Sequence, residues 1–335
     1  MSLVLLPATT TPRTAIPRRF LMCPPTYFDV RYAINAWMDP DVGVDAGLAV
    51  EQWRRLVQVY EELGHRVELL EPVPGLPDMV FAANGATVVD GLVLTARFAH
   101  HQRRAEAACH REWHQRDARA GSASNGREGR TSLVTSGRAV NEAEGDFAVL
   151  SDRVLAGYGF RTTRAAHREL AALTGRRVVS LQLVDPRFYH LDVALTVLDD
   201  RRDHIAYYPP AFAPGSRRLL AELFPDAILA TAADALVLGL NCVSDGRHVV
   251  LPAGAEHLAT ELAAAGYEPI PVDLSELVKG GGSVKCCTQE LRPRGLWGPR
   301  GLSSSKPQAL RRTQGAAATD RPETPTTDPT ESRLP

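Results

Sequence analysis

Short runs of mostly apolar, strand-forming residues recur along the chain, and turn residues divide these runs into pairs. Residues 86–98, ATVVDGLVLTARF, carry such runs on both sides of Asp90-Gly91, a pattern typical of a β-hairpin. Three further segments show the same arrangement: residues 147–160 with a turn at 151–152, residues 193–208 with a turn near 199–200, and residues 236–252 with a turn at 244–246. Four similar hairpins predict an internal repeat.

Most of these hairpins are followed by a stretch with helical periodicity and then by a short apolar strand. The predicted helices cover residues 164–174, 216–224 and 255–265. Another helix is predicted over residues 46–63, because its apolar residues recur at helical spacing and a glycine stands at the C-cap position. The repeating unit is therefore ββαβ. Such units lack the strands for one long parallel sheet, so we expect an α/β fold, a pseudo-symmetric propeller in one domain.

Two segments do not fit this repeat. Residues 115–139 are rich in Gly, Ser and Arg without any period, and residues 291–335 are rich in Pro, Thr, Ser and Arg. Such compositions are typical of irregular or disordered chain. We therefore expect a single catalytic domain over residues 1–290, with an irregular stretch at 115–139 and a disordered tail after it.

Composition narrows the classes of function. The 335 residues are 44% hydrophobic and 23% charged, as in a globular enzyme, and the formal net charge is -1. That balance argues against nucleic acid or an anionic membrane as the partner. The chain opens without a signal-peptide pattern and has no apolar run of about 18 residues, so a soluble, cytoplasmic protein is expected. Its five cysteines show no metal-ligand spacing, which predicts free thiols and no metal site.

The clearest candidate nucleophile follows a run of glycines in the segment GGGSVKCCT, residues 280–288. Glycines let the backbone approach a ligand closely, which makes Cys286 a candidate for a reactive thiol. The alternative is a pair of buried cysteines that pack as small apolar residues. Neighbouring strand residues point to opposite faces, so only one of Cys286 and Cys287 is expected to face a pocket.

Polar residues that could act with this thiol stand at the starts of the other predicted hairpins. His190 and Asp192 share one face by their spacing, so the imidazole could move protons while the carboxylate holds a cation; a structural His–Asp pair is the alternative. Three carboxylates also lie close together in NEAEGDF, residues 141–147. They could bind a cationic ligand, and the alternative is an ordinary exposed acidic turn. The further candidates for substrate binding are Asp78, Phe81, Asn84, Glu142, Glu144 and Asp146, with Arg97 and Arg161 for an acidic end of the substrate.

Ordered blocks of sequence resemble the guanidino-group-modifying superfamily of amidinotransferases and arginine deiminases, most closely its bacterial dimethylarginine dimethylaminohydrolases. The blocks are MCPPTYFDVRYAIN (22–35), VFAANG (80–85), NEAEGDF (141–147), AGYGFRT (156–162), DPRFYHLD (185–192), AYYPPAF (206–212), LGLNCVSDGRHVVLP (238–252) and VKGGGSVKCCT (278–288). The resemblance implies a five-bladed α/β propeller with a central pocket and no metal or organic cofactor.

The resemblance also implies roles for particular residues. Cys286 would be the nucleophile, His190 the general acid and base, and Glu142 the carboxylate that completes the site, with Glu144 as the alternative. Arg161 and Arg97 would hold the α-carboxylate of the substrate. The loop-like segment 26–39 is our expectation for a lid.

The function expected from this resemblance is hydrolysis of dimethylarginine to citrulline and dimethylamine through a covalent thiouronium intermediate. A second hypothesis is an arginine deiminase or amidinotransferase, because Asp192 suits an unsubstituted guanidinium. A third is a guanidine-binding protein without activity. The expected partner is a small guanidino compound, and a homodimer is left open.

Overall fold

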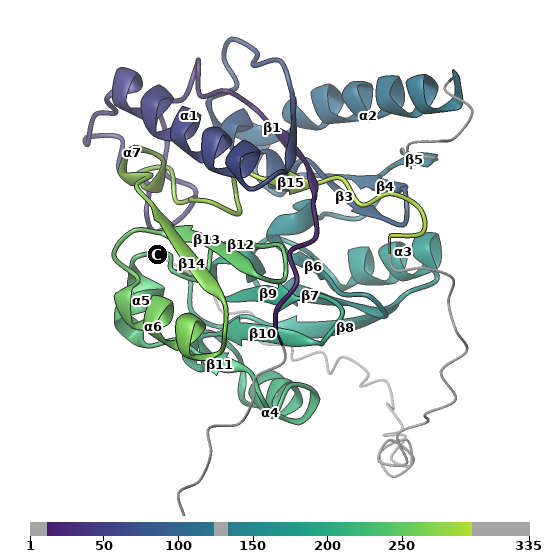
Figure 1. Cartoon of the computed structure of the whole chain (residues 1–335). Helices are drawn as coiled ribbons and strands as arrows, with labels where there is room; N and C mark the ends of the chain where they lie inside the picture. The colour runs from purple at the N-terminus through teal and green to yellow at the C-terminus, as the bar shows by residue number, and fades with distance from the viewer. Residues whose placement is uncertain (1–11, 124–132, 297–335) are drawn as a thin grey trace, which may run out of the picture. The chain divides into compact units, whose positions relative to one another are not determined.

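The computed structural model describes residues 12–123 and 133–296, which belong to one compact unit, Met1–Gly298. Within these residues the strands form five three-stranded sheets (Figure 1). Every sheet joins an antiparallel hairpin to a third, parallel strand. The fold is thus the expected five-bladed α/β propeller of ββαβ units.

The hairpin over residues 86–98 shows how local sequence fixes a blade. Strands β3 (Ala86–Val89) and β4 (Leu92–Thr95) pair with Val89 opposite Leu92, which leaves a two-residue turn. Both turn residues have positive φ, 52° at Asp90 and 76° at Gly91. An Asp-Gly pair tolerates that conformation best, so the turn sets the register of the hairpin.

The other strands follow the same order, and one blade is closed by the two ends of the domain. That blade contains β15 (Gln289–Glu290), β1 (Arg19–Met22) and β2 (Arg66–Leu69). The second blade adds β5 (Leu133–Ser136) to β3 and β4. The remaining blades are β6 (Phe147–Val149), β7 (Arg153–Tyr158) and β8 (Arg177–Gln182); β9 (Leu195–Asp199), β10 (His204–Tyr207) and β11 (Ile228–Leu229); and β12 (Val243–Ser244), β13 (His248–Pro252) and β14 (Glu268–Val272).

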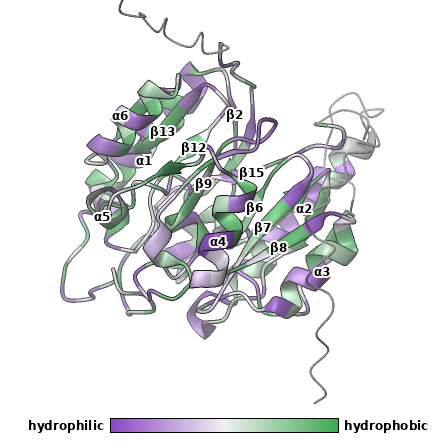
Figure 2. Ribbon diagram, turned by 90° about the horizontal axis from the view of Figure 1, so that it is seen from below, coloured by the Kyte–Doolittle hydropathy of each residue, from purple (hydrophilic) through white to green (hydrophobic). Residues whose placement is uncertain are grey.

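Within each blade a helix connects the second strand to the third. These helices are α1 (Ala46–Glu62), α2 (Glu106–Ala123), α3 (Arg164–Thr174), α4 (Pro214–Leu223) and α6 (Glu256–Ala264). Figure 2 shows hydrophobic residues concentrated on the strands and hydrophilic residues along the outer helices. The bounds predicted for α3 agree with the structure, where Ala166, Leu170 and Thr174 form its buried stripe. Gly175 adopts the left-handed conformation that ends the helix.

Short helices lie mainly in the loops between these larger elements. They are α5 (Ala232–Leu236) and α7 (Ser275–Val278), with the 3-10 turns η1 (Pro77–Val80), η2 (Ala82–Asn84), η3 (His101–Arg103), η4 (Ala143–Gly145), η5 (Leu191–Val193) and η6 (Pro209–Ala211). In the described residues no helix has the length and apolar character needed to cross a membrane.

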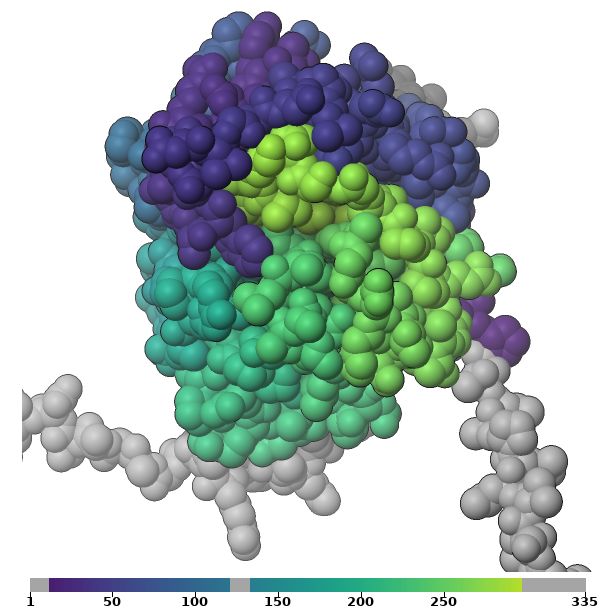
Figure 3. Space-filling model, turned by 90° about the vertical axis from the view of Figure 1, so that its left-hand side faces the viewer, coloured from purple at the N-terminus to yellow at the C-terminus, as the bar shows by residue number. Residues whose placement is uncertain are grey.

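The first strands of the blades surround a shared central space. A cavity of about 630 Å³ is lined by residues of β6, β9, β12 and β15, together with buried ion pairs such as Arg18–Asp200. Figure 3 shows residues from both ends of the described chain, purple and yellow-green, side by side on one face. On this face helix α1 contacts the segment around α7, and the pairing of β1 with β15 closes the ring of blades.

Three expectations about segment boundaries are wrong. Residues 115–123 continue helix α2, and residues 133–136 form β5 in parallel register with β4, so only 124–132 of the supposed irregular segment lies outside the described residues. Trp113 and Val134 pack against the same apolar cluster, which stabilises a segment whose own sequence is polar.

The second error concerns the end of the domain, which does not stop at residue 290. Leu291 and Arg292 are buried, and Arg292 pairs with Glu144. The rest of the expected tail, from residue 297, lies outside the described residues.

The third error concerns residues 236–242, which are not a strand. Helix α5 ends at Leu236, Leu238 has a φ of 56°, and only Val243–Ser244 pairs with β13. Gly239 packs so closely that a Cβ there would lie 2.8 Å from the Asp234 carbonyl oxygen. A tight apolar turn therefore replaces the predicted strand.

Candidate active site

All five blades place polar side chains in the loop that precedes their first strand. Because the first strands surround the axis, these loops bring distant parts of the sequence together. The residues involved are Asp78 and Asn84 before β3, Glu142 before β6, His190 and Asp192 before β9, Asn241 before β12, and Cys286 before β15. The repeated unit therefore positions the site, as the sequence predicted.

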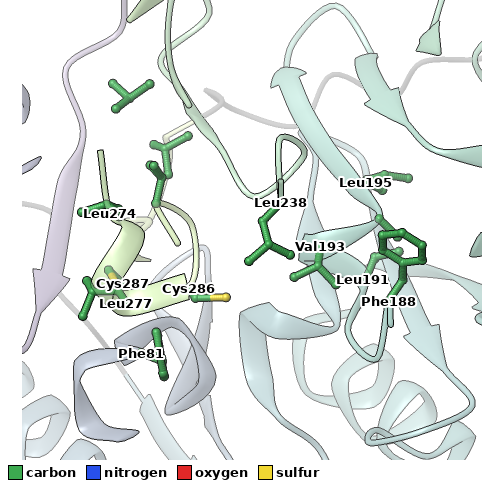
Figure 4. Packing of buried hydrophobic residues seen from close by; sticks show 14 of the residues in the cluster. Phe81, Phe188, Leu191, Val193, Leu195, Leu238, Leu274, Leu277, Cys286 and Cys287 are labelled. Atoms are coloured by element: carbon green, nitrogen blue, oxygen red, sulfur yellow. The ribbon is translucent and has the colours of Figure 1, made fainter. Parts of the chain in front are cut away.

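Cys286 lies on a loop that only small residues could form. A Cβ on Gly282 would lie 2.5 Å from the Phe81 ring and 2.9 Å from the Cys286 Cβ, and Gly281 has a φ of 85°. Figure 4 shows Cys286 directed toward the space in front of Leu238, whereas Cys287 points away beside Leu277. One cysteine of the pair therefore faces the site and the other packs in the core.

The thiol of Cys286 is buried and has two hydrogen-bond partners from other blades. It donates to Asp192 Oδ2 at 3.3 Å and accepts from Asn241 Nδ2 at 3.1 Å. Burial, and next the Asp192 carboxylate, raise the pKa of Cys286 well above its usual value. The thiol is therefore neutral in the free protein and needs a further positive charge before it ionises.

His190 forms a buried dyad with Glu142. Its Nε2 is 2.8 Å from Glu142 Oε2, which leaves Nδ1 without a protein partner. Burial opposes ionisation of Glu142, but the hydrogen bond to His190 and the charge of Arg161 outweigh it and hold the pKa of Glu142 below its usual range. A stable carboxylate on one ring nitrogen leaves the other nitrogen to exchange protons.

The two arginines expected to bind a carboxylate occupy different positions. Arg161 is buried, donates to Glu142 Oε2 at 2.8 Å and to the Ile34 carbonyl at 2.6 Å, and lines the pocket. Arg97 is exposed, and its backbone bridges to Asn141. Arg161 thus connects the catalytic dyad to the N-terminal loop, and carboxylate binding by either arginine stays a prediction.

Asp78 and Asn84 are held by an arginine that the sequence analysis missed. Arg103 donates to Asn84 Oδ1 at 2.8 Å and to the Asp78 carbonyl at 3.1 Å, while its ion pair with Glu106 fixes it in turn. Tyr32 donates to Asp78 Oδ2 at 2.8 Å. No motif in the sequence marked Arg103, because its partners are near only in the folded chain.

Glu144 and Asp146, which the sequence analysis expected to bind substrate, are instead held by other groups of the protein. Glu144 forms ion pairs with Lys285 and Arg292 and accepts from the Glu290 backbone. Asp146 accepts from the backbone N–H groups of Thr162 and Leu191. Protein donors therefore occupy both carboxylates. Of the two candidate glutamates, the geometry favours Glu142 for the catalytic dyad.

The pocket in front of Cys286 is small and is covered by the N-terminal loop. Ile34, Asn35 and Met38 contribute to its lining, and Asn35 Nδ2 donates to the Gly280 carbonyl at 3.2 Å. These residues belong to the segment 26–39 that we expected to form a lid. The loop lies over the site, as such a lid would require, and its movement stays a prediction.

Negative charge exceeds positive charge around this pocket. The buried charged groups are the carboxylates of Asp78, Glu106, Glu142 and Asp192 and the guanidinium groups of Arg103 and Arg161. Burial raises the pKa of Asp192 to about 6 and that of Glu106 to about 7. A bound cation would offset this cost and stabilise the ionised carboxylates. Across the described residues, no group of three or more His, Cys, Asp or Glu side chains is arranged to hold a metal ion.

The chain is similar in sequence to several known proteins. The chain is 53% identical over 287 residues to the N(G),N(G)-dimethylarginine dimethylaminohydrolase of Mycobacterium tuberculosis, covering 86% of this chain and 89% of that protein. It is 35% identical over 277 residues to the bifunctional arginine dihydrolase/ornithine cyclodeaminase ArgZ of Synechocystis, covering 81% of this chain but 37% of that protein. No protein-family model matches the sequence.

Solved structures show the same fold. The N-terminal domain of the cyanobacterial arginine dihydrolase ArgZ, bound to its substrate, superposes with a TM-score of 0.73 at 33% identity, covering 82% of this chain and 98% of that domain. A dimethylarginine dimethylaminohydrolase carrying a 4-chloro-2-hydroxymethylpyridine adduct superposes with a TM-score of 0.62 at 19% identity, covering 82% of this chain and all of that one.

Proposed function

Because the chain belongs to the dimethylarginine dimethylaminohydrolase family of the guanidino-group-modifying superfamily, we propose that it hydrolyses Nω,Nω-dimethylarginine to citrulline and dimethylamine. The observation that carries this proposal is the meeting of a buried thiol bonded to Asp192 with a His190–Glu142 dyad that also holds the pocket-lining Arg161. A guanidinium carbon is resonance-stabilised and resists water, so its hydrolysis needs a strong nucleophile beside groups that fix the cation.

The first half of the reaction uses the charge of the substrate to activate the thiol. The guanidinium displaces the thiol from Asp192 and adds a positive charge beside Cys286, which lowers the pKa of the thiol. Neutral His190 then takes the thiol proton. The thiolate then attacks the guanidinium carbon, and a C–S bond forms as that carbon becomes tetrahedral. His190, protonated and held by Glu142, gives its proton to the dimethylamino nitrogen. The C–N bond breaks, dimethylamine leaves, and a thiouronium remains on Cys286.

The second half returns the enzyme to its starting state. Neutral His190 takes a proton from water at Nδ1, and the resulting hydroxide attacks the thiouronium carbon. The C–S bond then breaks with its electron pair on sulfur, and His190 returns its proton to the thiolate. The hydroxyl proton of the product passes to solvent, which leaves citrulline and the neutral thiol. Since Nε2 of His190 stays with Glu142, one imidazole nitrogen serves as the acid in the first half and as the base in the second.

The test is a product assay. Purified protein is incubated with asymmetric dimethylarginine or with arginine, and citrulline, dimethylamine and ammonia are measured, with Cys286→Ser as the control. Citrulline and dimethylamine in equal amounts, both lost in the variant, are the expected result. Binding of dimethylarginine without any product would overturn the proposal and favour a guanidine-binding protein.

A second candidate is hydrolysis of unsubstituted arginine. The superposition with the arginine dihydrolase domain at a TM-score of 0.73 favours it. So do Asp78 Oδ1 and Asp192 Oδ1, two buried acceptors without protein partners, because an unsubstituted guanidinium has the donors that two methyl groups remove. Ammonia from arginine at a kcat/KM above that for dimethylarginine would promote this candidate, and transfer to an added amine would identify an amidinotransferase.

We also propose a cellular location and an oligomeric state for the protein. The five cysteines are free thiols and four of them are buried, as in proteins of reducing compartments, so we infer a cytoplasmic location, to be checked by cell fractionation. A homodimer is supported by exposed Leu69 and Leu133 on the outer strands β2 and β5. Light scattering that gives the mass of one chain would overturn the dimer.

A further inference from the structure

Asn241 lies at the centre of the site, although no sequence argument singled it out. Its Oδ1 accepts from the backbone N–H groups of Ser283 and Cys286, both at 3.1 Å. Its Nδ2 donates to the Asp192 carbonyl at 3.2 Å and to Cys286 Sγ at 3.1 Å. The side chain is fully buried. Every donor and acceptor position of the amide is occupied, which fixes its orientation.

The fixed orientation matters because the sulfur is otherwise in surroundings that oppose its negative charge. The second partner of Cys286 Sγ is the Asp192 carboxylate at 3.3 Å, an acceptor that favours the neutral thiol. An N–H that donates to the sulfur instead favours the thiolate, because this hydrogen bond becomes stronger as the sulfur becomes negatively charged. Asn241 cannot turn its amide away, because two backbone N–H groups of the nucleophile loop hold the oxygen. The donor is thus in place before any thiolate forms.

We propose that Asn241 is a further catalytic residue, whose amide N–H stabilises the Cys286 thiolate both when it attacks and when it is expelled from the thiouronium. Its catalytic part rests on the proposed function. Its effect on the thiol is a property of the free protein and can be measured without any substrate.

The experiment follows the alkylation of Cys286 by iodoacetamide between pH 6 and 10, with the modified peptide quantified by mass spectrometry. Wild type is compared with Asn241→Ala and Asn241→Asp. Below the pKa of the thiol, the alkylation rate is proportional to the fraction of thiolate, so we expect Asn241→Ala to be alkylated about tenfold more slowly than wild type at the same pH. Asn241→Asp should be slower still, because it adds a negative charge.

Cys242→Ala is the matched control. Cys242 is the next residue and equally buried, but its side chain packs with Leu240 and Val249 rather than on the sulfur. Its profile should equal that of wild type. Asn241→Asp also keeps two acceptor oxygens for the N–H groups of Ser283 and Cys286, so it carries the test if Asn241→Ala does not fold.

An unchanged alkylation rate in the folded Asn241→Ala protein, with only a lower melting temperature, would show that Asn241 merely braces the loop, and would overturn the proposal. In turnover assays kcat should fall more than KM rises. A wild type that shows the expected thiol profile but no turnover would count against the proposed reaction and leave the thiolate assignment supported.

Discussion

Gly145 offers a sharp test of the catalytic geometry, because the space in front of it is filled by two groups of the site. A Cβ at this position would lie 2.5 Å from Asn84 Nδ2 and 3.1 Å from His190 Nδ1. Ordinary contact begins at 3.4 Å, so the amide would have to retreat by about 0.9 Å and the imidazole by about 0.3 Å. Asn84 cannot retreat freely, since Arg103 holds its Oδ1 at 2.8 Å.

We therefore expect Gly145→Ala to impair catalysis more than folding. Overpacking of a buried site costs about 1–3 kcal/mol of stability, and a displacement of about 1 Å at a reacting centre lowers the rate by about 100-fold. Gly145 does not have a positive φ, so alanine meets no backbone strain and any loss comes from the side-chain contact.

The assay is citrulline formation from dimethylarginine, with kcat and KM measured beside a urea unfolding curve. Gly215→Ala is the control, because nothing lies within 4 Å of its added Cβ. It should keep wild-type kinetics. A Gly145→Ala protein whose kcat stays within threefold of wild type would refute the close approach of Asn84 and His190 described here.

Three further perturbations follow from the structure. Glu142→Gln should lower kcat by about 100-fold or more. Glu144→Gln should instead lower the free energy of unfolding by about 3–5 kcal/mol and leave the kcat of the folded protein unchanged. Steady-state kinetics and urea unfolding curves on both variants test this, and an equal loss of kcat in the two would contradict the assignment of Glu142 to the dyad. Burial lowers the pKa of His110 to about 3 and that of His114 to about 4, so the folded protein is most stable above about pH 6.5, where both imidazoles are neutral, and loses stability as the pH falls toward 4. At pH 5 each histidine should lower the free energy of unfolding by about 2 kcal/mol. The melting temperature of His110→Leu should therefore depend less on acid pH than that of wild type. Burial raises the pKa of Asp192 to about 6, so the KM of wild type should rise as the pH falls below 6, whereas that of Asp192→Asn should not. A wild-type KM that does not change over this range would count against cation binding by this carboxylate.

The sequence by itself determined the local elements and the identity of the main reactive groups. The hairpin of β3 and β4 around Asp90-Gly91 and the helix that ends before Gly175 depend on residues close to one another in the sequence. Their bounds could therefore be predicted almost correctly. The glycine run before Cys286 and the spacing of His190 and Asp192 are also local signals. Repetition of these units indicated the propeller, because each ββαβ unit must bury its sheet against others.

Other parts of the chain were decided by contacts between distant residues. Strand β5 follows a polar, aperiodic stretch and owes its structure to parallel pairing with β4 and to the packing of Val134 on an apolar cluster that Trp113 of α2 also contacts. The sequence also could not separate Glu142 from Glu144, which stand two residues apart. The turn at Ala143, with a φ of 51°, leaves Glu142 with His190 and Glu144 with Arg292.

Arg103 and Asn241 show the same limit for single side chains. No local pattern marks either residue as part of the site, and each acquires its role from partners that the fold brings close. Arg103 holds Asn84 from 19 residues away within one blade, and Asn241 reaches Cys286 across 45 residues and between two blades. The chemistry of each group follows from its residue type, but its partner follows from the tertiary structure.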